Sequence, residues 1–231
     1  MQRRASAALS LTALVTLAVT GCGNDSSTSA PSDSAPAAKA RPTPTAEPAG
    51  VPLTSAALTA RLLDESDLGE GYTRRAKSDN SDRDDVTVIG CPALEKLGGN
   101  GAAGGELDFP NSAEVTFSYA RGSGSEVAEE LYSDTVDKLG PNTRTVFEAM
   151  TGCPLYQVVV GDAPIAVATQ KLPAPALGDE AWSQLLTLTA GGRDTVMKQT
   201  AVRVGSVLVV VSGSPALVDT HLTRAVEKAR G

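Results

Sequence analysis

The chain has few of the side chains on which hydrolases depend. Its 231 residues include one histidine, three cysteines, three phenylalanines, four tyrosines and one tryptophan. The single histidine, His221, excludes a His-Glu-x-x-His zinc protease, and no Gly-x-Ser-x-Gly elbow accompanies it to supply a serine nucleophile. The scarcity of aromatic rings also disfavours a sugar-stacking platform. The sequence therefore predicts a protein that is not an enzyme, with a wall-modifying hydrolase as the least favoured alternative.

Excess positive charge is also lacking. The chain carries 20 basic and 27 acidic residues, a net charge of −7, and has no basic cluster. Nucleic-acid binding depends on neutralising phosphates, and docking on anionic lipid uses polybasic segments, so neither is expected.

No motif for a metal ion or a cofactor is complete. The acidic residues 79–85 lack the glycine and the closing glutamate of a calcium loop, and the glycine-rich residues 98–105 are not followed by Gly-Lys-Ser/Thr. Both segments are interpreted as surface loops, and we expect no metal and no cofactor.

The first 21 residues have the pattern of a secretory signal. A basic start at Arg3 and Arg4 precedes an apolar run that is too short to span a membrane. Val-Thr-Gly before Cys22 resembles the lipobox of bacterial lipoproteins, in which this cysteine is acylated and becomes the mature N-terminus. We therefore expect a protein lipid-anchored through Cys22 on the outer face of the cell membrane. The export route, general secretory or twin-arginine, stays open.

Two further segments follow the signal. Residues 22–52 are rich in Ser, Ala, Pro and Thr, a composition typical of a disordered tether. Residues 53–231 are expected to form one domain. Outside the cytoplasm its two cysteines, Cys91 and Cys153, are predicted to form a disulfide, because two thiols without histidines are too few for zinc.

Hydrophobic periodicity predicts an α+β fold with an antiparallel sheet. Expected helices cover residues 55–67, 92–97, 125–139, a short stretch around 146–150, and a final segment after Ser214-Pro215; expected strands cover residues 86–89, 113–119, 155–160, 165–171, 181–190, 195–204 and 207–212.

The clearest local pattern is a two-residue hairpin at Gly205-Ser206, between two valine-rich runs. The expected register pairs Val204 with Val207, Val202 with Val209, and Thr200 with Val211. One side of this ribbon is then almost all valine and must pack against another element.

Three large side chains are candidates for lining a ligand cleft: Tyr72, Trp182 and Arg203. Each has a purely structural alternative. Trp182 would be a core anchor, Tyr72 an ordinary strand residue, and Arg203 a solvated charge on the ribbon.

Several segments, in this order, resemble the extracellular sensor domain of PknH-like actinobacterial receptor kinases and the related free-standing lipoproteins. They are residues 62–72 (LLDESDLGEGY), Cys91-Pro92, Cys153-Pro154, residues 177–181 (LGDEA) and residues 202–210 (VRVGSVLVV).

The resemblance implies a twisted antiparallel sheet, flanked by helices, that forms an outward-facing cleft and senses a ligand without catalysis. The chain departs from it in having cysteines for one disulfide rather than two, and in carrying no kinase of its own. The favoured hypothesis is an envelope lipoprotein that binds an unidentified small ligand or an envelope protein. The alternative is a protein-binding accessory subunit of a signalling or transport complex.

Overall fold

The computed structural model describes residues 50–76, 86–97, 107–122 and 124–231. The predicted signal peptide, the predicted acylation site Cys22, the predicted tether up to residue 49 and both predicted loops, 79–85 and 98–105, lie outside these residues. Within the described ranges, no helix has the length and apolar character needed to cross a lipid bilayer.

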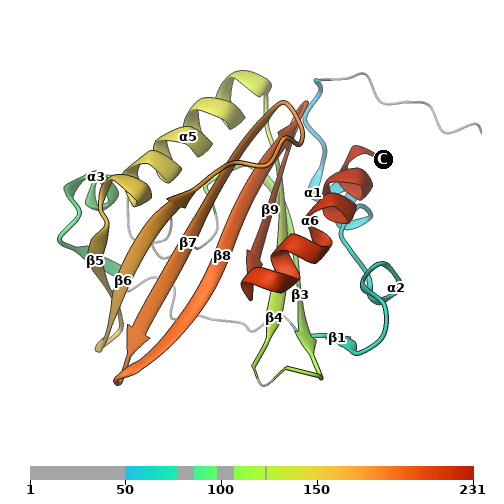
Figure 1. The fold of residues 1–231 in the computed structure, drawn as a ribbon. Coiled ribbons are helices and arrows are strands. Elements are labelled where there is room, and N and C mark those ends of the chain that lie inside the picture. Colours follow the sequence, from blue (N-terminus) through green and yellow to red (C-terminus); the bar gives the residue numbers. More distant parts are fainter. Residues whose placement is uncertain (1–49, 77–85, 98–106, 123) are drawn as a thin grey trace, which may run out of the picture. The chain divides into compact units, whose positions relative to one another are not determined.

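The centre of the fold is a twisted sheet of nine strands, all paired antiparallel (Figure 1). Their order across the sheet is β1-β3-β4-β9-β8-β7-β6-β5-β2. The bounds are β1 Tyr72–Arg74, β2 Val86–Ile89, β3 Asn111–Tyr119, β4 Glu126–Ser133, β5 Leu155–Val160, β6 Ala163–Leu172, β7 Glu180–Ala190, β8 Arg193–Val204 and β9 Val207–Gly213.

Five helices are present in the described part of the chain: α1 Ser55–Thr59, α2 Glu65–Leu68, α3 Pro92–Glu95, α5 Val136–Gly152 and α6 Pro215–Arg230. The two long helices, α5 and α6, lie on opposite faces of the sheet, as Figure 1 shows. The predicted α+β fold with an antiparallel sheet flanked by helices is therefore confirmed.

The β8–β9 hairpin explains why both faces need a helix. The register is the predicted one, with Val204 opposite Val207, Val202 opposite Val209, and Thr200 opposite Val211. The valine side packs against α6, and the other side contributes to a separate core under α5. Gly205 has a positive φ of 57°, a conformation that a hairpin turn requires and that glycine adopts without strain.

The helix predicted over residues 125–139 is wrong. Glu126–Ser133 forms β4, which pairs with β3 on one side and with β9 on the other. Leu131 and Tyr132 are both fully buried, on opposite faces of the sheet. Burial alternates along β4 as far as Leu131, but the polar Glu129 occupies a core-facing position between Val127 and Leu131, so the apolar-polar alternation that identifies strands is lost from the sequence. The Ala, Glu and Leu content of the segment favours helix, and tertiary pairing overrides this local propensity.

Two further helix predictions need correction. The single helix expected over residues 55–67 is two short helices, because Asp64 begins a new one with a capping box to Asp67. Conversely, α5 runs through Gly140 and Pro141 without ending, so the predicted separate helix around 146–150 is part of it.

The predicted disulfide is present. Cys91 and Cys153 are joined with their Cα atoms 5.8 Å apart, at a sequence separation of 62. Cys91 precedes α3 and Cys153 follows α5, so the bond holds the end of α5 against the β2–α3 connection.

Candidate functional site

A cleft of about 390 Å³ lies between α5 and the adjoining ends of β6 and β7. Its volume is within the range of small-molecule sites. The side chains on which its chemistry depends come from three segments: Arg144, Phe147 and Glu148 of α5, Lys171 and Leu172 of β6, and Trp182 of β7.

The cleft exists because β6 ends before its neighbour does. Leu172 is the last residue of β6 and lies opposite Ser183, so the start of β7 has a paired strand only on its β8 side. Pro173 follows Leu172 and cannot donate a backbone hydrogen bond. Half-buried Trp182 is thereby left beside the opening, with its ring centroid 6.3 Å from that of Phe147.

Arg203 lies behind this cleft as part of an ion-pair chain. Its Nε and Nη2 donate to one carboxylate oxygen of Glu180, at 3.0 and 2.9 Å, and its Nη1 donates to Asp179 at 3.1 Å. The other oxygen of Glu180 accepts from Arg144 Nη2 at 2.7 Å. Arg203 is buried and does not line the cleft. It positions Glu180, and Glu180 positions Arg144 at the cleft wall.

The close approach of α5 to these ion pairs depends on Gly140. A Cβ atom at this position would lie 2.7 Å from a carboxylate oxygen of Glu180, inside the normal contact distance. Glycine here therefore lets the helix pack directly over the ion pairs that support the cleft.

Tyr72 lies on the other face of the sheet, at its β1 edge. Its hydroxyl is 2.7 Å from His221 Nε2, and its ring packs against Tyr119 at a centroid distance of 4.7 Å. Burial raises the pKa of Tyr72, with a smaller contribution from Tyr119, and burial lowers the pKa of His221. His221 is thus a buried hydrogen-bonding partner of Tyr72, and its burial favours the neutral form of its imidazole.

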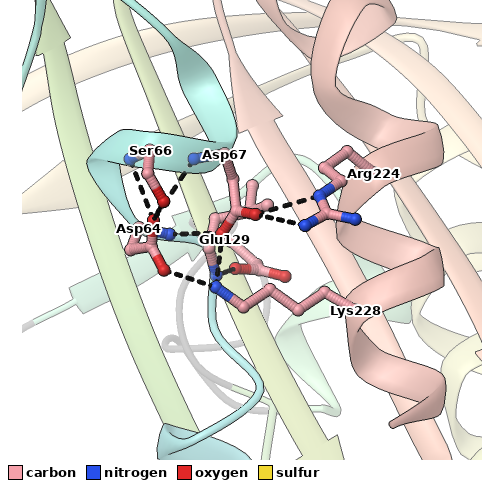
Figure 2. Close-up of polar contacts among 7 residues, drawn as sticks. Asp64, Ser66, Asp67, Glu129, Arg224 and Lys228 are labelled. Carbon is pink, nitrogen blue, oxygen red and sulfur yellow. Dashed lines mark hydrogen bonds and ion pairs between the residues drawn. The ribbon is translucent and has the colours of Figure 1, made fainter. Parts of the chain in front are cut away.

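A second polar cluster lies on this α6 face, where Asp64, the N-cap of α2, and Asp67 within α2 meet Arg224 and Lys228 of α6 (Figure 2). Lys228 binds both carboxylates, at 2.7 Å for Asp64, and Arg224 donates to Asp67 through two nitrogens. The Lys228 contact is the main reason that the pKa of Asp64 is lowered. Burial alone would raise the pKa of Asp67, but the bonds that it accepts, first from Lys228, lower it.

Glu129 reaches the same cluster from β4, on the core side (Figure 2). Glu129 is only 1% exposed. Its Oε2 accepts a hydrogen bond from the Leu63 N–H at 2.6 Å, and its Oε1 has no hydrogen bond in the described part of the chain. Burial raises the pKa of Glu129 to about 8, although the Leu63 bond and the charge of Lys228 act against this. At neutral pH the carboxyl group is mainly protonated.

Among solved structures, the fold is similar to the extracellular domain of PknH from Mycobacterium tuberculosis. The match has a TM-score of 0.55 at 14% sequence identity, and it covers 78% of this chain and 98% of that domain. No protein-family model and no curated protein sequence matches the chain. At this identity the likeness shows a shared fold.

The structure places the three candidate residues in different surroundings. Trp182 lines the cleft, Arg203 lies behind it as a support, and Tyr72 lies on the opposite face with His221. The structural alternative for Arg203, a solvated charge, is wrong because the residue is only 8% exposed.

Sequence reasoning missed Arg144 and Lys171 as cleft residues. Each is an exposed charge in an ordinary helix or strand pattern, and only the tertiary arrangement brings them beside Trp182. The sequence does contain a signal for Glu129, because this residue stands between Val127 and Leu131 on the face of β4 that packs into the core.

Proposed function

We propose that this protein is an extracytoplasmic, lipid-anchored and non-catalytic sensor-like lipoprotein that binds a small ligand in the cleft between α5 and β7. The observation that carries the proposal is the cleft itself, an opening of about 390 Å³ beside the only tryptophan of the chain. Ligand sites are typically concave and mostly apolar, with a few fixed polar groups, and this one has an aromatic wall and a charged rim.

Two further observations support binding rather than catalysis. The fold resembles an extracellular domain of a receptor kinase, as the sequence segments indicated. In addition, the only histidine is buried against Tyr72 on the opposite face of the sheet from the cleft. A hydrolase that used this imidazole would have to bind its substrate on the opposite face of the sheet, away from the cleft.

The direct test is retention of a small molecule. The full chain carrying Cys22→Ser, which cannot be acylated, is incubated with the low-molecular-weight fraction of an envelope extract and examined by native mass spectrometry. Trp182→Ala is the test variant and Leu155→Ala the control, because Leu155 is 67% exposed and does not line the cleft. A bound mass that survives Leu155→Ala and disappears with Trp182→Ala supports the proposal.

Two outcomes would overturn it. Retention that is unaffected by Trp182→Ala would place the ligand outside the cleft. A clean spectrum, with an envelope protein recovered by crosslinking, would favour the accessory-subunit alternative. Comparison of the extract before and after incubation tests the absence of catalysis, because consumption of a component would contradict it.

The anchor is tested separately. Replacing Cys22 by alanine is expected to release the protein from the membrane fraction into the medium, because acylation at this position is the proposed attachment. Continued retention in the membrane fraction would contradict the anchor.

A further inference from the structure

Several hydrogen-bond donors around the cleft have no partner or keep N–H groups that are not used. Within the described ranges, the ammonium group of Lys171 and the indole N–H of Trp182 make no hydrogen bond or ion pair, and both residues line the cleft. Arg144 uses only Nη2, in its bond to Glu180, which leaves its remaining N–H groups available. These are three donors, two of which carry a positive charge.

Negatively charged acceptors around the cleft are fewer than positively charged donors. Glu148 is the one carboxylate among the described lining residues, and it lies on the exposed side of α5. Glu180, close by, is already bound by Arg203 and Arg144. An anionic ligand therefore meets two positive charges, of Arg144 and Lys171, with N–H groups that are not used, whereas a cation would meet these two like charges and one carboxylate, of Glu148.

Arg144 can turn toward a ligand without leaving a buried charge behind. Its side chain is 55% exposed, and an exposed ion pair of this kind contributes little to stability. Glu180 would keep both bonds from Arg203 if Arg144 moved. The arrangement holds a guanidinium group near the opening at low energetic cost.

The remaining wall is apolar. The rings of Phe147 and Trp182 are inclined at 34°, and Leu172 and Pro173 complete the surface. A ligand that consists only of a charged group would leave this surface exposed to water.

We propose that the cleft selects a small amphipathic anion. Its carboxylate or phosphate group would lie between Arg144 and Lys171, and its short or flat apolar body would lie against Trp182 and Phe147. This inference rests on the proposed function and adds the chemical class of the ligand.

The test uses four probes with one apolar body: phenylbutyrate, phenylbutyl phosphate, phenylbutanol and phenylbutylamine. Because Trp182 is the only tryptophan, its fluorescence reports directly on the cleft, and the phenyl probes do not absorb where it is excited. The full chain carrying Cys22→Ser is titrated with each probe into the millimolar range. We expect at least one anion to bind about tenfold or more tightly than the alcohol, and the amine to bind most weakly. The carboxylate and phosphate arms distinguish the two sources of negative charge.

Two variants connect this preference to the named residues. The double substitution Arg144→Met with Lys171→Met is expected to bring the ratio between anion and alcohol close to one, while the alcohol still binds. Lys138→Met is the control, since Lys138 is 62% exposed on the same helix and does not line the cleft. It should leave the ratio unchanged.

The failures of the two proposals are distinguishable. Equal affinities for the anions and the alcohol, or an anion preference that survives the double substitution, would overturn the ligand class and leave the cleft as a binding site. No change of Trp182 fluorescence with any probe would overturn the ligand class as well, and the extract experiment with Trp182→Ala would then decide the proposed function independently.

Discussion

Replacing Glu129 by glutamine is expected to change how the stability of the protein depends on pH. The side chain is buried on β4 and accepts a hydrogen bond from the Leu63 N–H, and burial raises its pKa to about 8 from an ordinary value of 4.5. The folded protein therefore holds a proton that the unfolded chain has already released. The stability that this proton contributes is fully present below about pH 4.5 and is lost as the pH rises to about 8.

The size of the effect follows from the two pKa values. One unit of pKa difference corresponds to about 1.4 kcal/mol, so the wild type should lose up to about 5 kcal/mol across this pH range through Glu129 alone. Glutamine is uncharged at every pH and keeps a carbonyl oxygen for the Leu63 N–H. At about pH 5 the two proteins should differ by no more than about 1 kcal/mol, whereas above about pH 8 the variant should be more stable by several kcal/mol.

The measurement is urea unfolding, followed by the fluorescence of Trp182, at a series of pH values from about 5 to about 9. His221 acts in the opposite direction, because its lowered pKa favours folding as the pH rises. It is present in both proteins, so the difference between them isolates Glu129. Glu70→Gln, an exposed carboxylate near the same α2 segment, is the control. A difference between wild type and Glu129→Gln that stays constant with pH would refute the assignment of a protonated, buried carboxyl group.

Three further predictions concern the supports of the cleft. Replacing Cys91 and Cys153 together by alanine should lower the free energy of unfolding by about 4 kcal/mol in the loop-entropy model, as measured by urea unfolding; an unchanged midpoint would contradict the disulfide. Arg203→Met should lower the free energy of unfolding by about 3 kcal/mol, because it leaves the carboxylates without their buried partner. Arg144→Met, at the exposed end of the same series of ion pairs, should lower it by less than about 1 kcal/mol. Equal losses in thermal or urea unfolding would contradict this arrangement. Gly140→Ala gains about 1 kcal/mol of helix propensity but places a Cβ atom 2.7 Å from Glu180 Oε1. Because two bonds from Arg203 hold this oxygen, moving it aside should cost about 2 kcal/mol, so a small net loss of stability is expected. A stabilised variant would show that α5 does not approach Glu180 so closely.

The C-terminal half of the fold was predictable from sequence because its signals are local. Gly205-Ser206 fixes a hairpin turn, and the register of β8 and β9 follows from it. Ser214-Pro215 then marks the start of α6. Each of these features depends on residues that are adjacent in sequence.

The region around β4 was not predictable in this way. Its secondary structure depends on pairing with β9, which lies about 80 residues further along the chain and covers the whole strand from Val127 to Ser133. Gly140 and Pro141 lie inside α5, directly after the point where the helix predicted over residues 125–139 ends. For β4 the pairing that decides the structure is distant in sequence, and at residues 140–141 glycine and proline locally disfavour the helix that the structure has, so in both places local propensity favours the alternative.

The register of the strands accounts for which candidate residues come together. In the β7–β8 pair, Glu180 lies opposite Arg203 and Trp182 lies opposite Ala201, so Trp182 and Arg203 share one face of the sheet. That Trp182 and Arg203 share a face follows directly from the register of the two strands. The turn at residues 177–181, which leads into β7, also supplies the acidic partners of Arg203. The position of α5 over that face is a separate matter, because it depends on the disulfide at Cys153 and on the missing side chain at Gly140. Changes at these two positions should therefore alter the cleft while leaving the β8–β9 hairpin intact.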